Sequence, residues 1–140
     1  HRARIIWIDE MVDQQTACEF YSHAAVFVCP SIYEPFGIIN LEAMACETPV
    51  VATAVGGIKE VVVDCETGFL VPLEQMKESP FEAIDPEKFA RDIAERVNEL
   101  MRDRQLRERF GNAGRKRVEE NFSWAAIAEK TKALYASLLS

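Results

Sequence analysis

Short apolar runs alternate with longer amphipathic stretches along the first half of the chain. The runs fall at residues 4–8, 25–29, 49–53 and 68–71 and are rich in Ile, Val and other apolar residues. Uninterrupted runs of this length are typical of strands that are covered on both faces, as in a parallel sheet. The stretches between them carry helical patterns, over residues 13–24 and from Ile38 to Cys46. Strands that alternate with helices predict an α/β fold with a Rossmann-like parallel sheet flanked by helices.

The second half of the chain is predicted to be helical. Asp85 followed by Pro86 is typical of a helix start, and further helices are expected over residues 103–120 and from Ser123 onwards. The apolar positions of the three helices are Phe89, Ile93, Val97 and Leu100; Leu106, Phe110, Ala113 and Val118; and Trp124, Ile127, Ala128, Leu134, Tyr135 and Leu138. Residues 73–84 before them form a loop that is long for a compact domain.

Composition narrows the functional class. The 140 residues fit one domain, and a hydrophobic content of 49% is enough for a core. A formal net charge of −7 argues against nucleic acid as the main partner, because phosphate backbones are bound by clustered Lys and Arg. No apolar run approaches the roughly 20 residues that span a membrane, and no signal-peptide pattern opens the chain.

The cysteines and histidines give no sign of a metal site. The four cysteines form no CxxC pair, which favours free, mostly buried thiols in a reducing cytoplasm: Cys18, Cys29, Cys46 and Cys65. The two histidines, His1 and His23, lie far apart and show no metal-ligand spacing. We interpret His23, at the end of a helical pattern, as a capping or packing residue.

The stretch from Pro30 to Ala45 carries the most chemical information. Pro30 ends the preceding strand because it has no N–H to donate, and Pro35 drives Glu34 towards an extended backbone. Gly37 allows a tight turn and close approach of a ligand to the backbone. The resulting loop lies at the carboxyl end of a strand, where open α/β sheets bind ligands.

A helix is expected to begin near Ile38, directly after this loop. Its first N–H groups have no partner inside the helix and carry partial positive charge, which suits a phosphate. Glu42 lies about one turn further on, and helical side chains tilt towards the N-terminus, so its carboxylate can point back to the loop. Backbone amides for a phosphate and two carboxylates, Glu34 and Glu42, for hydroxyl groups together predict a nucleotide-sugar site.

A second glycine loop follows the next strand. Gly56 and Gly57 are expected at the same edge of the sheet, before a short helix that contains Lys59. A simple turn and a ligand contact are equally compatible with this pattern, so Gly57 and Lys59 are further candidates for the site.

Residues 27–45 closely resemble the signature of retaining glycosyltransferases of family 4, in which two Glu, here Glu34 and Glu42, are separated by seven residues. Further matches in the expected order are 48–53, 55–62, 67–71 and 122–124, so the resemblance covers nearly all of the chain. The sequence of residues 29–35 and 40–46 is most similar to the bacterial glycogen synthase branch, especially its actinobacterial form.

The resemblance implies the GT-B architecture, in which two Rossmann-like domains enclose the active site. Residues 1–140 are then the donor-binding C-terminal domain, incomplete on its N-terminal side, and the absent N-terminal domain selects the acceptor. The implied reaction transfers glucose from ADP-glucose or UDP-glucose to an α-1,4-glucan or a small glucosyl acceptor, with retention at the anomeric carbon. The resemblance implies no metal and no cofactor other than the substrate.

The resemblance also assigns roles to individual residues. Glu34 is the candidate catalytic residue and contacts the donor sugar together with the backbone of Phe36, Gly37 and Ile38. The amides of Ile38 and Ile39 face the diphosphate, and Glu42 takes the ribose hydroxyls.

Two departures from the family pattern concern positive charge. The Arg and Lys that the family uses to neutralise the diphosphate are expected upstream of His1. Lys59 stands where family members often have Pro, which gives Lys59 a phosphate role of its own or removes the Gly56–Gly57 loop from the site.

Three alternatives stay open at this point. The chain could belong to another glycosyltransferase of family 4 or to a nucleotide-sugar epimerase, although the spacing of Glu34 and Glu42 argues against an epimerase. It could also be a non-catalytic binding module, and we expect the isolated chain to have no transferase activity.

Overall fold

The computed structural model describes residues 5–139 and contains a three-stranded parallel sheet between layers of helices. The strands β1 (Phe27–Cys29), β2 (Val50–Thr53) and β3 (Gly68–Val71) lie in the order β1-β2-β3. Phe27 pairs with Val50 at one interface and Val50 with Gly68 at the other. The α/β fold class predicted from the sequence is therefore confirmed.

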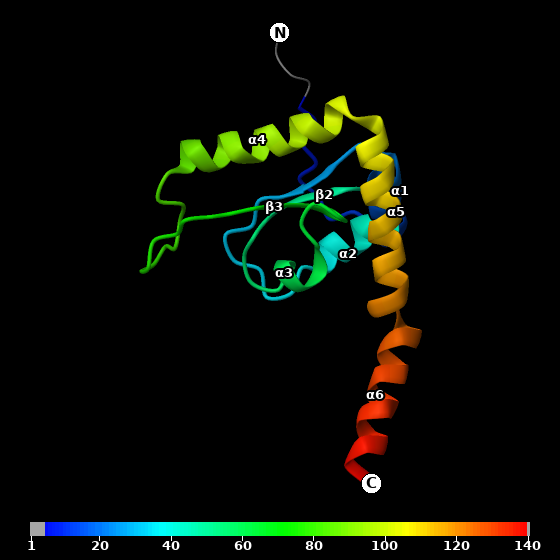
Figure 1. Ribbon diagram of the computed structural model, residues 1–140. Coiled ribbons are helices and arrows are strands. Elements are labelled where there is room, and N and C mark those ends of the chain that lie inside the picture. Colours follow the sequence, from blue (N-terminus) through cyan, green and yellow to red (C-terminus); the bar gives the residue numbers. More distant parts are fainter. Residues whose placement is uncertain (1–4, 140) are drawn as a thin grey trace.

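Helices cover both faces of the sheet. They are α1 (Gln14–His23), α2 (Ile38–Ala45), α3 (Ile58–Val61), α4 (Pro86–Arg102), α5 (Arg104–Asn121) and α6 (Trp124–Leu139). Figure 1 shows α4 on one side of the sheet, α2 and α3 on the other, and α6 extending away from the rest of the domain. None of the described residues of α6 is buried.

The core lies on both faces of β2, whose four residues are all buried. Val50 and Ala52 pack with the apolar side chains of α2 and α3, whereas Val51 packs with Leu100 of α4 and Phe110 of α5. Successive side chains of a strand point to opposite faces. A strand that is apolar at every position is therefore covered on both sides, as the continuous run predicted.

Aspartates cap three of the helices. The carboxylates of Asp13, Asp85 and Asp103 accept hydrogen bonds from the amides of Thr16, Lys88 and Leu106, at 2.7, 2.8 and 2.9 Å. These bonds satisfy amide groups of the first turn that have no partner within the helix. The predicted starts after Asp13 and Asp85 are confirmed.

The prediction of a buried strand over residues 4–8 is wrong for its described part. Residues 5–8 belong to no strand, and the side chain of Ile5 is 86% exposed. A strand needs a neighbour to satisfy its backbone groups and apolar layers to cover both faces. Among the described residues β1 pairs with β2 alone, so residues 5–8 have no neighbouring strand and no apolar layers that cover them. Arg4 lies outside the described residues.

The four cysteines are free, but the expectation that most of them are buried is wrong. Cys29 is buried and Cys46 is partly buried, whereas Cys18 and Cys65 are exposed. His23 does act at the end of a helix, since its Nδ1 lies 2.8 Å from the carbonyl oxygen of Glu19. Within residues 5–139, no helix is long and apolar enough to cross a membrane.

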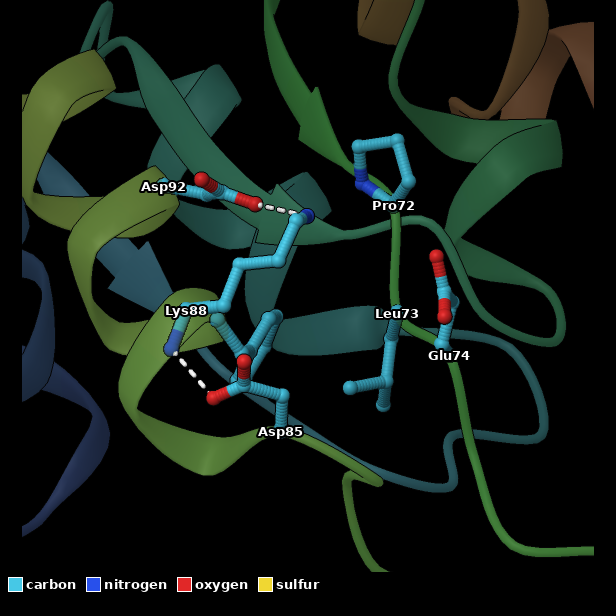
Figure 2. Close-up of a pocket in the computed structure, with 7 residues that line it drawn as sticks. Pro72, Leu73, Glu74, Asp85, Lys88 and Asp92 are labelled. Atoms are coloured by element: carbon cyan, nitrogen blue, oxygen red, sulfur yellow. Dashed lines mark hydrogen bonds and ion pairs between the residues drawn. The ribbon is translucent and has the colours of Figure 1, made fainter.

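The loop predicted over residues 73–84 is confirmed, and in the structure it extends over residues 72–85, between β3 and α4. Figure 2 shows its two ends, with Leu73 from the strand side and the first turn of α4 around a small hollow. The Nζ of Lys88 lies 2.8 Å from a carboxylate oxygen of Asp92 there. The hollow has a volume of about 20 Å³, which holds a water molecule rather than a ligand.

Candidate functional site

The loop between β1 and α2 lies at the carboxyl end of the sheet, where the sequence predicts the site. Gly37 adopts a left-handed backbone with φ of 97° and precedes the first residue of α2. A Cβ atom at this position would lie 2.8 Å from Nδ2 of Asn40, so a larger residue would have to displace this side chain as well as adopt a strained backbone. The tight turn predicted for Gly37 is therefore confirmed.

The first turn of α2 offers free amide groups to a ligand. The amide of Asn40 already donates to the carbonyl of Gly37 at 3.0 Å. Among the hydrogen bonds of the described chain, none uses the amides of Ile38 and Ile39, and both residues are exposed. These amides carry the partial positive charge of the helix N-terminus and suit an anionic group.

Glu34 is held by the second glycine loop. The amide of Gly57 donates to the carbonyl of Glu34 at 3.0 Å. A Cβ atom on Gly56 would lie only 2.0 Å from the same carbonyl oxygen, and Gly56 has a φ of 46°. The two glycines therefore allow one loop to pack directly on the backbone of the other, and the Gly57 amide is used within the fold.

Lys59 lies in α3, beside a residue that supports the turn. The side chain of the preceding Ile58 is buried and would meet a Cβ atom on Gly37 at 3.3 Å, so α3 packs under the start of α2. Lys59 itself is exposed. The structure thus brings the Lys59 segment and the Gly37 turn into contact.

Glu42 is oriented by Tyr21. The phenol of Tyr21 donates to Oε2 of Glu42 at 3.2 Å, which joins α1 to α2. Burial, followed by the negative charge of Glu42, raises the pKa of Tyr21 to about 12. The phenol therefore stays protonated and keeps its hydrogen to donate at neutral pH.

A hollow of about 500 Å³ opens beside Glu42, between α1 and α2. Its lining residues are Val12, Gln14, Ala17, Cys18, Tyr21, Glu42, Ala45 and Cys46. This volume falls within the range of about 300–1,000 Å³ that is usual for small-molecule sites. The carboxylate of Glu42 thus borders open space of ligand size.

Asn40 lies buried beneath the loop. Its Nδ2 donates to Sγ of Cys29 at 3.7 Å, whereas Oδ1 has no hydrogen-bond partner among the described residues. An unpaired buried carbonyl costs about 1–3 kcal/mol, which the rest of the fold offsets.

The site is acidic apart from its amide groups. Of the ion pairs formed by residues 5–139, none includes Glu34 or Glu42. The same residues hold no cluster of three His, Cys, Asp or Glu side chains that could bind a metal ion. Carboxylates without a cationic partner are free to accept hydrogen bonds from hydroxyl groups of a ligand.

Sequence reasoning missed three residues that shape this site. None of Tyr21, Asn40 and Gln75 was expected in the site. The one available signal is helical spacing, which places Tyr21 on the packed side of α1. Its contact with Glu42 could not be predicted, because it depends on how α1 and α2 pack together. Gln75 reaches the loop from a segment 43 positions away in the chain, and no local pattern records that contact.

Comparison with protein families matches this chain to the family described as "Glycosyl transferases group 1", over residues 2–117. The α-maltose-1-phosphate synthase of Mycolicibacterium smegmatis is 48% identical over 134 residues, which is 96% of this chain and 33% of that protein. Its counterpart from Mycobacterium tuberculosis is 47% identical over 135 residues, again 96% and 33%.

Solved structures share the fold. A sucrose-phosphate synthase from Thermosynechococcus elongatus has a TM-score of 0.73 and 39% identity, covering 91% of this chain and 29% of that one. The C-terminal domain of a glycosyl transferase group 1 family protein from Francisella tularensis has a TM-score of 0.64 and 28% identity, covering 84% and 53%. This chain therefore spans about a third of the length of the curated relatives named above.

Proposed function

Because this chain belongs to the glycosyl transferases group 1 family, we propose that it is the donor-binding part of a retaining glucosyltransferase. The donor is ADP-glucose or UDP-glucose, and residues 1–140 supply the nucleotide-sugar side of the active site. One observation carries the proposal: two free amides at the start of α2 lie along the chain between Glu34 and Glu42, neither of which has a cationic partner in the described chain.

Each part of a nucleotide sugar has a matching group in this arrangement. The amides of Ile38 and Ile39 take a phosphate oxygen, because helix N-termini favour anions. Glu34 and the backbone of Phe36 and Gly37 take hydroxyls of the glucose. Glu42, steadied by Tyr21, takes the ribose hydroxyls, and the hollow beside it leaves room for the rest of the nucleoside.

Catalysis at such a site consists largely of positioning and of stabilising the leaving diphosphate. The helix N-terminus contributes about 0.3–1 kcal/mol of charge stabilisation at an exposed position, which is too little for a diphosphate near two carboxylates. Lys59 is the candidate cation of this chain, and we expect further cationic side chains from other parts of the enzyme.

The names of the relatives favour a small glucosyl acceptor over a long glucan. Maltose 1-phosphate contains two glucose units and one phosphate, so a glucosyl transfer that forms such a product needs a glucose phosphate as acceptor. We therefore propose a glucosyl phosphate as the acceptor, which the enzyme extends by one glucose, with an α-1,4-glucan as the second acceptor to be compared.

The proposal is tested by measuring glucosyl transfer from ADP-glucose and from UDP-glucose in the enzyme that carries this chain. We expect Glu34→Gln to lower kcat by about 100-fold or more, in the range found when one stabilising group of an active site is removed. Glu42→Gln should raise the donor KM by about tenfold, the equivalent of one charged hydrogen bond.

The matched control is Glu66→Gln, which changes an exposed carboxylate in the turn before β3. Wild-type kinetics in both site variants would contradict the site. Release of free nucleotide from the wild type without any glucoside product would indicate an epimerase or a hydrolase instead of a transferase.

A further inference from the structure

The ring of Phe36, in the loop between β1 and α2, packs against a ring at the junction of α5 and α6. Its centroid lies 6.2 Å from that of Phe122, at an interplanar angle of 62°. Tilted pairs at this distance are an arrangement that aromatic side chains prefer. The side chain of Phe36 is still 39% exposed. The contact with Phe122 therefore holds the loop in place and leaves part of it open.

Phe122 is fixed by the turn that joins the two helices. It follows the last residue of α5, and its amide donates to the carbonyl of Val118 at 2.9 Å. The next residue, Ser123, accepts a hydrogen bond through Oγ from the amide of Ala126 in the first turn of α6, at 3.2 Å. These bonds satisfy backbone groups at both helix ends, so Phe122 offers a fixed surface to Phe36.

Arg117 joins the ring of Phe122 to the end of α3. Its Cζ lies 5.5 Å from the ring centroid, which is within reach of a cation–π attraction. Nε of Arg117 donates to the carbonyl of Val61 at 2.8 Å, and Nη2 donates to that of Glu60 at 2.7 Å. No ion pair among residues 5–139 includes Arg117. Its place is therefore set by these carbonyls and by the ring.

The helix α3 thus supports the loop from both of its ends. At its start, the amide of Gly57 donates to the carbonyl of Glu34 at 3.0 Å. A Cβ atom on Gly57 would lie only 2.5 Å from Cα of Phe36, so the two backbones are in direct contact. At its end, α3 reaches the same loop through Arg117 and Phe122. The contacts form a closed circuit that fixes the loop backbone.

We propose that Phe122 and Arg117 are positioning residues, which hold the loop backbone at Phe36 against the sugar of the donor. This inference rests on the proposed function, in which Glu34 and the backbone of Phe36 and Gly37 take hydroxyls of the glucose. The same proposal assigns the phosphate and the ribose to α2, which neither side chain supports. Loss of the ring contact should therefore weaken the hold on glucose and spare the hold on the nucleotide.

The test compares the binding of ADP and of ADP-glucose by calorimetry in the enzyme that carries this chain, with UDP and UDP-glucose as a second pair. Phe122→Leu keeps an apolar side chain and removes the ring. The ratio of the Kd for ADP-glucose to the Kd for ADP should rise about fivefold in this variant, the equivalent of one aromatic pair. The Kd for ADP should stay at its wild-type value, and Phe122→Tyr should restore the ratio. Misfolding would instead lower the stoichiometry, which calorimetry reports separately.

Arg117→Met and Arg109→Met form a matched pair. Arg109 also lies 5.5 Å from the centroid of a phenylalanine ring, that of Phe110, which packs in the core with Val51. Arg117→Met should raise the same ratio as Phe122→Leu does, because it releases the ring from α3. Arg109→Met should leave the ratio unchanged.

Three results overturn the positioning role. They are an unchanged ratio in Phe122→Leu, an equal loss of affinity for ADP and ADP-glucose, and a ratio that Arg109→Met raises as much as Arg117→Met. A folded wild type that binds none of the four ligands would overturn the proposed function itself, and this inference with it.

Discussion

Single atoms decide how the two glycine loops fit together. Gly56 approaches the carbonyl of Glu34 so closely that any Cβ atom there would overlap it, and its φ of 46° is unfavourable for other residues. The position of Glu34 thus depends on the close packing of Gly56 against its carbonyl. A role for this loop in ligand binding was expected as an equal alternative, and its contacts show how it can shape the site without touching a ligand.

Gly56→Ala should therefore destabilise the domain by more than about 1 kcal/mol, because alanine is forced into a left-handed backbone against a carbonyl. Urea unfolding monitored by circular dichroism measures this change. The matched comparison is Gly114→Ala in α5, where the backbone has no positive φ and the new Cβ would come no nearer than 3.3 Å to another atom, the Cγ of Met44. Equal unfolding midpoints for Gly56→Ala and the wild type would contradict the packing described.

The hydrogen bond between Tyr21 and Glu42 should be visible in the pH dependence. Burial, followed by the charge of Glu42 and the bond to it, raises the pKa of Tyr21 from 10.0 to about 12, so the folded state holds the phenolic proton more tightly than the unfolded state does. The stability that comes from this bond is complete below pH 10 and is lost as the pH rises towards 12. Phenolate absorbance should show a late-titrating group that Tyr21→Phe removes. A Tyr21→Phe variant with the same titration curve as the wild type would contradict this assignment.

At the scale of the elements, Asp103 holds two helices at once. Its carboxylate accepts from the amide of Leu106 at 2.9 Å to cap α5, and its own amide donates to the carbonyl of Glu99 at the end of α4. Leu100 and Phe110 on either side of it pack in the same core cluster with Val51. The angle between the two helices, and with it one face of the sheet, therefore depends on this corner.

Asp103→Ala should cost about 1 kcal/mol of stability, the usual value for the loss of an N-cap, and Asp103→Asn should cost much less because asparagine also caps well. Thermal unfolding of the two variants compares them directly. If asparagine proves as harmful as alanine, the carboxylate charge rather than the cap is what matters.

Most elements could be predicted because their signals are local. The proline at the end of β1, the glycine before α2 and the aspartates before α1 and α4 each act within a few residues. The run at residues 5–8 was misread because burial of a strand depends on what lies beside it, and β1 has no second neighbour among the described residues.

The local backbone of the candidate site was predictable from the sequence, whereas its long-range contacts were not. The turn at Gly37 and the open first turn of α2 follow from local rules, and the structure places them as expected. The contacts of Tyr21 with Glu42 and of Gln75 with Ile32 join segments 21 and 43 residues apart. Such contacts depend on the packed fold, and a Tyr or a Gln in the sequence does not indicate which distant residue it will contact.

At the scale of the whole molecule, loops from three parts of the chain meet at the carboxyl edge of the sheet. The loop between β1 and α2 is supported by the Gly56–Gly57 turn on one side and is joined by Gln75 to the β3–α4 loop on the other. Figure 1 shows the β3–α4 loop leaving the sheet on the side away from α5. We expect a nucleotide sugar to be bound at the centre of this edge.

The most direct test is an NMR titration of the chain with ADP, ADP-glucose and UDP-glucose, following the backbone amides. The account predicts that the largest shifts occur from Gly37 to Glu42, with the amides of Ile38 and Ile39 foremost, and that Glu42→Gln weakens them. A well-dispersed spectrum in which residues 37–42 stay unshifted at millimolar nucleotide, or shift equally in the Glu42→Gln variant, would contradict the proposed donor site.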